Sequence, residues 1–121
     1  MPQYNDWKYG LSALPPQLTA SATSPRNAEA MRERYRAANI AYVVGADDNS
    51  ASKAASYQVL DKSCAANLQG PFRLQRAVAF QAYDKAVIRP AQPRTLTIVP
   101  GCAHSATCVL PSAEMRAVLF P

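Results

Sequence analysis

The sequence predicts an α/β fold, with a partial parallel sheet flanked by helices. Two short runs of apolar and β-branched residues, at 40–44 and 95–99, are the predicted strands. A helical apolar pattern separates them, which is the order of a β-α-β unit with a right-handed crossover. Because the first run is apolar without alternation, we expect its strand to be covered on both faces, and we expect the second, β-branched run to form a buried strand. A buried charge in either strand, introduced as Val43→Asp or Ile98→Asp, would then abolish folding.

Three helices are expected around these strands. The first follows Ser24, a capping residue, and Pro25, which suits a first helical position; its apolar positions recur every three or four residues. The second opens at 69–71 and ends before Pro90, and the third covers 112–119. A short helix at 52–60 has a weaker signal. Residues 1–23 are expected to form an irregular segment, and residues 24–121 the α/β segment.

Composition indicates one globular domain and argues against several classes of partner. The 121 residues are 49% hydrophobic and 17% charged, with a net charge of +5. The basic residues are scattered, and the densest group, at 32–36, is interleaved with Glu29 and Glu33, so we expect no nucleic-acid binding. No apolar run reaches the roughly 20 residues that a membrane span needs. If Met1 is the native start, the lack of a signal peptide favours the cytoplasm.

Neither a metal nor a cofactor is expected. The chain has one histidine and three spread cysteines, Cys64, Cys102 and Cys108, which is a poor zinc signature. An odd number of cysteines leaves at least one thiol without a partner in the chain. Cys64 is interpreted as a buried small apolar residue or as half of a disulfide in a longer protein.

The titratable residues that draw attention follow the two strands. Asp47 and Asp48 come after the first, and the single histidine, His104, comes after the second. The carboxyl ends of parallel strands share one edge of a sheet, so an aspartate can reach the imidazole. Such a carboxylate would fix the tautomer and leave the other ring nitrogen free as a general base. The alternatives are solvated carboxylates and a histidine satisfied by backbone groups, in which case His104→Ala would cost about 1–3 kcal/mol.

Four segments, in this order, resemble the C-terminal portion of α/β-hydrolase-fold proteins: residues 42–48, 61–66, 69–73 and 99–105. Residues 7–11 are similar to the segment that precedes this portion in one branch of the superfamily. The resemblance implies that Asp48, third after Gly45, is the acid of a catalytic triad and that His104 is its histidine, with Asp47 as the second choice of acid. It also implies a mostly parallel sheet and hydrolysis of esters, amides or related bonds.

The sequence departs from this superfamily at the nucleophile. No Gly-x-Ser-x-Gly elbow occurs, and Ser105 and the three cysteines are weak substitutes. We therefore expect a truncated or degenerate hydrolase-like protein that is inactive alone. The alternatives are a subunit that complements a separate nucleophile-bearing chain and a small binding module. Because two strands are too few for a stable sheet, a homodimer or a complementing chain is expected to complete it.

Overall fold

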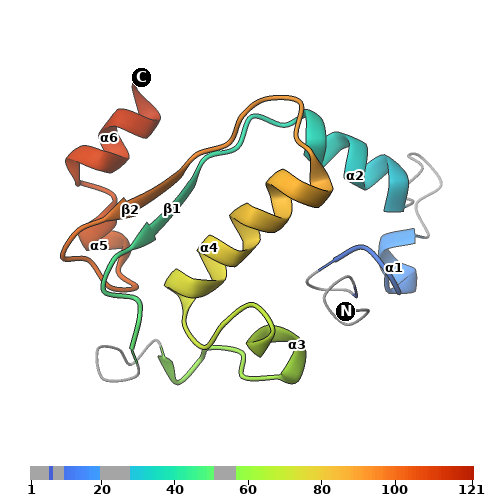
Figure 1. Ribbon diagram of the computed structural model, residues 1–121, viewed down its shortest axis with the longest axis horizontal. Helices are drawn as coiled ribbons and strands as arrows, with labels where there is room; N and C mark the ends of the chain where they lie inside the picture. The colour runs from blue at the N-terminus through green and yellow to red at the C-terminus, as the bar shows by residue number, and fades with distance from the viewer. Residues whose placement is uncertain (1–5, 7–9, 20–27, 51–56) are drawn as a thin grey trace.

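The computed structural model describes residues 6, 10–19, 28–50 and 57–121, and within them the predicted α/β class is confirmed (Figure 1). Strands β1 (Tyr42–Gly45) and β2 (Leu96–Val99) form a two-stranded parallel sheet. Tyr42 lies opposite Leu96, and Gly45 lies opposite Val99. The sheet passes between α4 on one side and α5 and α6 on the other. The remaining helices are α1 (Pro16–Thr19), α2 (Ala28–Ala37), α3 (Cys64–Asn67), α4 (Arg73–Tyr83), η4 (Asp84–Ile88), α5 (Ala106–Val109) and α6 (Ala113–Leu119).

Local sequence signals account for the ends of the longer helices. Helix α4 continues as the π-helical turn η4, which ends where Arg89 takes a left-handed conformation (φ 55°) just before Pro90. Helix α6 begins after Ser112, whose hydroxyl accepts the backbone N–H of Met115 at 3.1 Å. Helix α2 matches the predicted periodic segment, although its expected start at Ser24 and Pro25 lies outside the described residues.

Short elements are where the sequence-based expectations fail. Residues 1–23 were expected to be irregular, but α1 forms one helical turn with Pro16 at its first position, which proline tolerates. Of the expected helix at 52–60, residues 52–56 lie outside the described part, and 57–60 form a turn that buries Leu60. Helices α3 and α5 were not expected, because four residues are too few to show a period.

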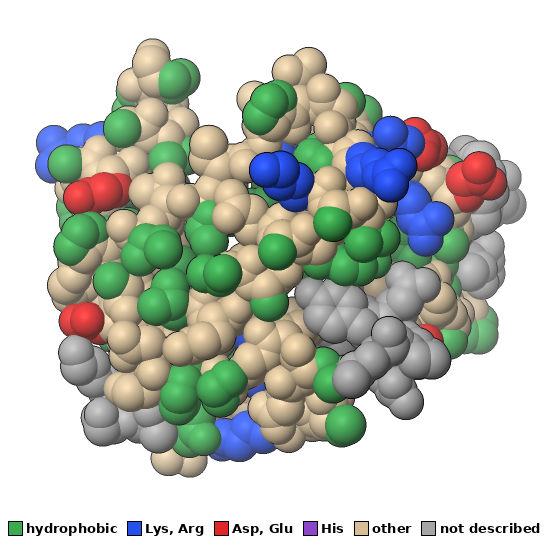
Figure 2. Space-filling model, viewed as in Figure 1, with side chains coloured by type: hydrophobic (Ala, Val, Ile, Leu, Met, Phe, Trp, Pro, Cys, Tyr) green, Lys and Arg blue, Asp and Glu red, His purple; other side chains and the backbone are tan. Residues whose placement is uncertain are grey.

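The sheet is less buried than expected. Val99 is 1% exposed, but Ile98 is 43% exposed, so the expectation that residues 95–99 form a buried strand is wrong for one face of β2. Two strands offer little surface, and the short helices α5 and α6 leave part of one face open. The apolar core of the described part consists of Leu60, Ala66, Val99 and Cys102. Hydrophobic side chains are visible across the surface in Figure 2, and the large exposed ones are Val59, Val78, Val87, Ile98, Leu110, Leu119 and Phe120.

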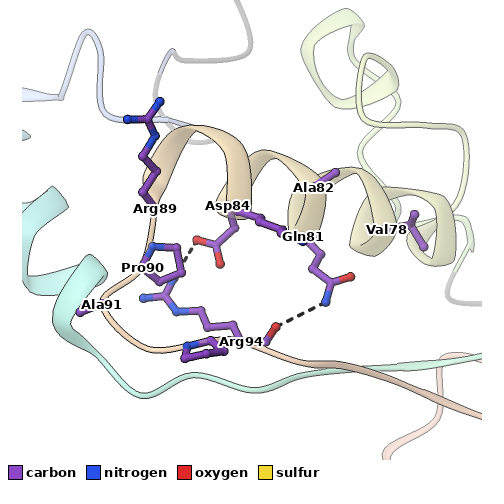
Figure 3. A pocket seen from close by; sticks show the side chains of 10 residues that line it. Val78, Gln81, Ala82, Asp84, Arg89, Pro90, Ala91 and Arg94 are labelled. Atoms are coloured by element: carbon purple, nitrogen blue, oxygen red, sulfur yellow. Dashed lines mark hydrogen bonds and ion pairs between the residues drawn. The ribbon is translucent and has the colours of Figure 1, made fainter.

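A buried ion pair fixes the point at which β2 begins. Arg94 donates to the Asp84 carboxylate at 2.7 Å, and both side chains are 2% exposed (Figure 3). The same guanidinium also donates to the backbone carbonyls of Tyr35, in the last turn of α2, and Ala38, just after its end. It lies 4.4 Å from the centre of the Tyr35 ring. Arg94 therefore ties α2 and η4 to the start of β2, beside a cavity of about 710 Å³.

Within the described residues, none of the helices has both the length and the apolarity needed to cross a bilayer.

Candidate functional site

The site is built where the two strands end. The Ala46 N–H donates to the Val99 carbonyl, and the Asp47 N–H donates to the Cys102 carbonyl, both at 2.9 Å. These bonds draw the loop after β2 onto the loop after β1. Gly45 makes the approach close: a Cβ at this position would lie 2.2 Å from the Cys102 carbonyl oxygen. Only glycine fits here without a backbone shift.

The carboxylate at this edge belongs to Asp48, whose side chain is 9% exposed. Its backbone is held at both ends, since its N–H donates to the Gly45 carbonyl at 3.2 Å and its carbonyl accepts the Leu74 N–H at 3.0 Å. The second bond ties the loop after β1, which carries Asp47 and Asp48 (the acidic loop), to the first turn of α4. Asp48 is thus fixed by the strand before it and by the helix that crosses to the next strand.

His104 meets this carboxylate directly. Its Nδ1 lies 3.0 Å from Oδ2 of Asp48, and its side chain is 53% exposed. When the imidazole is neutral, this contact favours the tautomer with the proton on Nδ1, which leaves Nε2 as a proton acceptor. The predicted Asp–His contact forms, and Asp48 makes it, whereas Asp47 contributes the backbone bond to Cys102. The half-exposed position of His104 does not favour the interpretation of a satisfied core histidine.

A third charged group lies at the site. The Arg73 guanidinium, 20% exposed, lies 3.7 Å from Oδ1 of Asp48, so the carboxylate lies between a fixed cation and an imidazole. Sequence reasoning assigned no role to Arg73. The available signal was its position two residues after Pro71, where the sequence predicts that the helix opens, because a helix that leaves the sheet edge carries its first turn past the neighbouring loop.

His104, Asp48 and Arg73 lie on a groove of about 570 Å³. Most of its wall is apolar, formed by β1, the middle of α4, α5 and the start of α6. Its other lining residues are Val43, Val44, Gly45, Ala77, Ala103, Ser105, Ala106, Val109, Leu110 and Met115. An apolar wall with a few convergent polar groups is typical of a small-molecule or peptide site.

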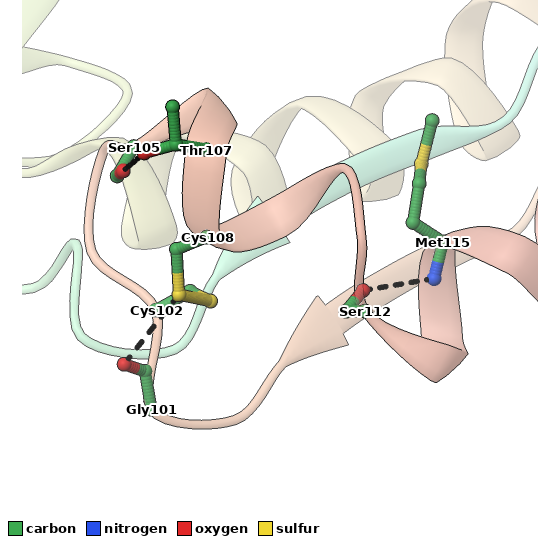
Figure 4. Close-up of a disulfide and its surroundings, with 7 residues drawn as sticks. All are labelled: Gly101, Cys102, Ser105, Thr107, Cys108, Ser112 and Met115. Atoms are coloured by element: carbon green, nitrogen blue, oxygen red, sulfur yellow. Dashed lines mark hydrogen bonds between the residues drawn. A yellow bond between two sulfur atoms is a disulfide. The ribbon is translucent and has the colours of Figure 1, made fainter.

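None of the weak substitutes for a nucleophile, Ser105 and the three cysteines, is placed to serve as one. The Ser105 hydroxyl lies 3.0 Å from that of Thr107. Cys102 and Cys108 are joined in a disulfide and offer no thiol (Figure 4). Cys64 lies on α3, which does not line the groove, and it is exposed, so the interpretation of Cys64 as a buried residue is wrong. The described residues thus bring an acid and a base together without a placed nucleophile.

Among the described residues, no cluster of three or more metal-ligating side chains is present. Comparisons of the chain with protein-family models, curated proteins and solved structures find no match.

Proposed function

We propose that this chain is the acid–base part of an α/β-hydrolase-like site, with Asp48 as the acid, His104 as the general base, and a nucleophile that comes from outside this sequence. The complete site would hydrolyse an ester, amide or related bond. The observation that carries the proposal is the 3.0 Å contact between Asp48 and the Nδ1 of a half-exposed histidine on an apolar groove.

The chemistry assigned to each residue follows from this contact. His104 Nε2 would take a proton from a hydroxyl in the groove, and the resulting imidazolium would be stabilised by the Asp48 carboxylate. The Arg73 guanidinium lies 3.7 Å from Oδ1 of Asp48, whereas His104 contacts Oδ2, so the two groups approach different oxygens of the same carboxylate. Because none of the described residues places a hydroxyl against Nε2, we expect the chain alone to have no serine-type activity.

The missing nucleophile would arrive on a strand that pairs with the edge of β1 that faces away from β2, an edge that none of the described strands covers. Tyr42 and Ala46 donate their N–H groups to β2. Because backbone groups alternate along a strand, those of Val43 and Gly45 point away from β2. Val43 and Gly45 also line the groove, so a strand added at this edge would end beside His104. The exposed apolar side chains of this small fold favour the same interpretation.

A fluorophosphonate probe for activated serines tests whether the nucleophile is absent. We expect the purified chain not to be labelled, and His104→Ala to behave as the wild type. Stoichiometric labelling that His104→Ala abolishes would show that the chain holds its own activated serine, and the proposal would be wrong.

A proline substitution tests the strand edge. Val43→Pro removes the N–H that points away from β2, which an edge strand tolerates, so the fold should remain. Self-association, or association with a nucleophile-bearing chain, should be lost in a sedimentation experiment. Val44→Pro is the matched control, because it removes an N–H from the ladder between β1 and β2 and should unfold the sheet. If association survives in a folded Val43→Pro variant, this edge does not carry it.

A further inference from the structure

We propose that the Cys102–Cys108 disulfide is a positioning device for His104, so that the contact between His104 and Asp48 depends on the oxidised state of these cysteines. The catalytic meaning of this inference rests on the proposed function, but its geometry does not. The two cysteines lie on either side of the histidine, six positions apart in sequence, with 5.7 Å between their Cα atoms. The disulfide therefore closes a short loop that contains His104.

One end of this loop is anchored to the sheet. Cys102 is 4% exposed, and its carbonyl accepts the Asp47 N–H at 2.9 Å. Gly45 lies against the same carbonyl, so close that a Cβ on residue 45 would lie 2.2 Å from its oxygen. Cys102 is thus hydrogen-bonded to Asp47, the residue that directly precedes Asp48.

The other end is a helix of four residues, α5, which begins just after the histidine. Cys108 lies on this helix (Figure 4). The N–H groups of Cys108 and Val109 donate to the Ser105 carbonyl, so these bonds close the turn on itself and do not reach the sheet. A single helical turn is marginal without a tertiary anchor. The disulfide supplies a covalent anchor to the buried Cys102.

The spacing explains why the histidine depends on both ends. His104 is two residues after Cys102 and four before Cys108, and its side chain is half exposed. Exposed loop side chains are held by few packing contacts, so a fixed imidazole needs a fixed backbone. When the disulfide is closed, the backbone of His104 is restrained from both sides, and Nδ1 stays within reach of Asp48.

Reduction requires an external thiol, which we take to be a small monothiol or dithiol. Its thiolate attacks Sγ of Cys108, the less buried of the two cysteines, forms a mixed disulfide there and releases the Cys102 thiolate, which takes up a proton. A second thiolate then attacks the sulfur of the bound reagent. Cys108 leaves as a thiol after protonation, and the reagent leaves as its own disulfide. The protein gains two electrons and two protons, and the reagent loses them.

Imidazole nitrogen NMR on the ¹⁵N-labelled chain tests the inference, because His104 is the only histidine and its signals need no assignment. At a pH where the ring is neutral, the oxidised chain should give one protonated nitrogen, Nδ1, and one bare nitrogen, Nε2. Asp48→Ala supplies the reference signals of the ring without its acceptor. After reduction with a dithiol, the signals should move from the wild-type positions to those of Asp48→Ala, while the backbone amide signals of β1 and β2 stay in place.

Two variants separate this effect from general damage by the reagent. Cys108→Ser should reproduce the reduced state without reagent. Cys64→Ser, which leaves the disulfide intact, should reproduce the oxidised wild type and still respond to the dithiol. Signals of His104 that do not change on reduction would overturn the inference.

General unfolding would also overturn the inference. If the sheet amide signals are lost together with the His104 signals, the disulfide stabilises the whole fold and does not act on the His104 loop alone. Because the readout is a tautomer and not turnover, a failure of Asp48 and His104 to activate an added nucleophile would contradict the proposed function and leave this inference standing.

Discussion

Gly45, the last residue of β1, lies against the backbone carbonyl of Cys102, the residue that closes the histidine loop. A Cβ on residue 45 would lie 2.2 Å from this oxygen and 2.5 Å from the carbonyl oxygen of Ala103. Both atoms belong to the backbone, so they cannot rotate out of the way. The acidic loop and the loop that carries His104 can therefore approach each other this closely only because residue 45 has no side chain.

Gly45→Ala is expected to separate these loops. Overpacking of this kind costs about 1–3 kcal/mol in the free energy of unfolding. The imidazole signals of His104 should also move toward those of Asp48→Ala. Gly101→Ala is the matched control, because a Cβ there meets nothing within 4 Å and strains only the backbone (φ 68°). It should cost about 1–2 kcal/mol and leave the His104 signals in place. Equal displacement of the His104 signals in both variants would contradict the steric argument.

Neighbouring residues of β2 should respond differently to a charge. Val99 is 1% exposed and Ile98 is 43% exposed. Val99→Asp buries a carboxylate without a partner and should abolish cooperative unfolding in denaturant. Ile98→Asp can keep its charge in water and should leave the protein folded, with a cost of about 1–2 kcal/mol from lost apolar burial. An unfolded Ile98→Asp variant would show that the open face is covered in solution.

The buried pair of Asp84 and Arg94 should be the most sensitive ion pair of the described part. Asp84→Ala leaves a guanidinium buried without its counter-ion, which costs about 3–5 kcal/mol. The exposed pair of Glu33 and Arg36 is the matched control, and Glu33→Ala should cost less than about 1 kcal/mol. Chemical denaturation of both variants measures the difference. Similar costs would mean that Arg94 does not tie α2 and η4 to β2.

Alkaline pH should weaken the same region through Tyr35. Burial raises the pKa of the Tyr35 hydroxyl, and its contact with the Tyr42 hydroxyl at 2.5 Å raises it further. A group whose pKa is raised by folding contributes stability below its unfolded pKa, here 10.0, and loses this contribution as the pH rises through the folded value. The free energy of unfolding should therefore fall above about pH 10. In Tyr35→Phe, which cannot ionise at this position, the fall should be smaller; an equal fall would place its origin elsewhere.

The sequence was sufficient for the features that depend on long or repeated patterns. The apolar runs predicted both strands, and the placement of two aspartates and His104 after them predicted an Asp–His contact, which Asp48 makes. The features that could not be predicted depend on tertiary structure. The exposure of Ile98 is set by how much surface the short helices cover, and the disulfide is set by the Cα separation of Cys102 and Cys108. Arg73 reaches Asp48 only because α4 starts at the same sheet edge.

His104→Ala separates the interpretations of the histidine by stability alone. The side chain is half exposed, and Asp48 keeps Arg73 nearby when the imidazole is removed. We therefore expect a loss below about 1 kcal/mol in the free energy of unfolding, which is typical of surface positions. A loss of about 1–3 kcal/mol in denaturant unfolding would instead indicate a structural histidine whose removal leaves a buried partner unsatisfied.

The central claim, that Asp48 and His104 form a working acid–base pair without a nucleophile, is tested most directly by supplying the nucleophile. The measurement is the alcoholysis of an activated ester by a small primary alcohol, with and without the purified chain. The account predicts a protein-dependent rate that His104→Ala abolishes and that Asp48→Asn lowers at least about tenfold, since general-base catalysis contributes about 10²–10⁴-fold. A rate that is the same in the wild type, His104→Ala and Asp48→Asn would contradict it.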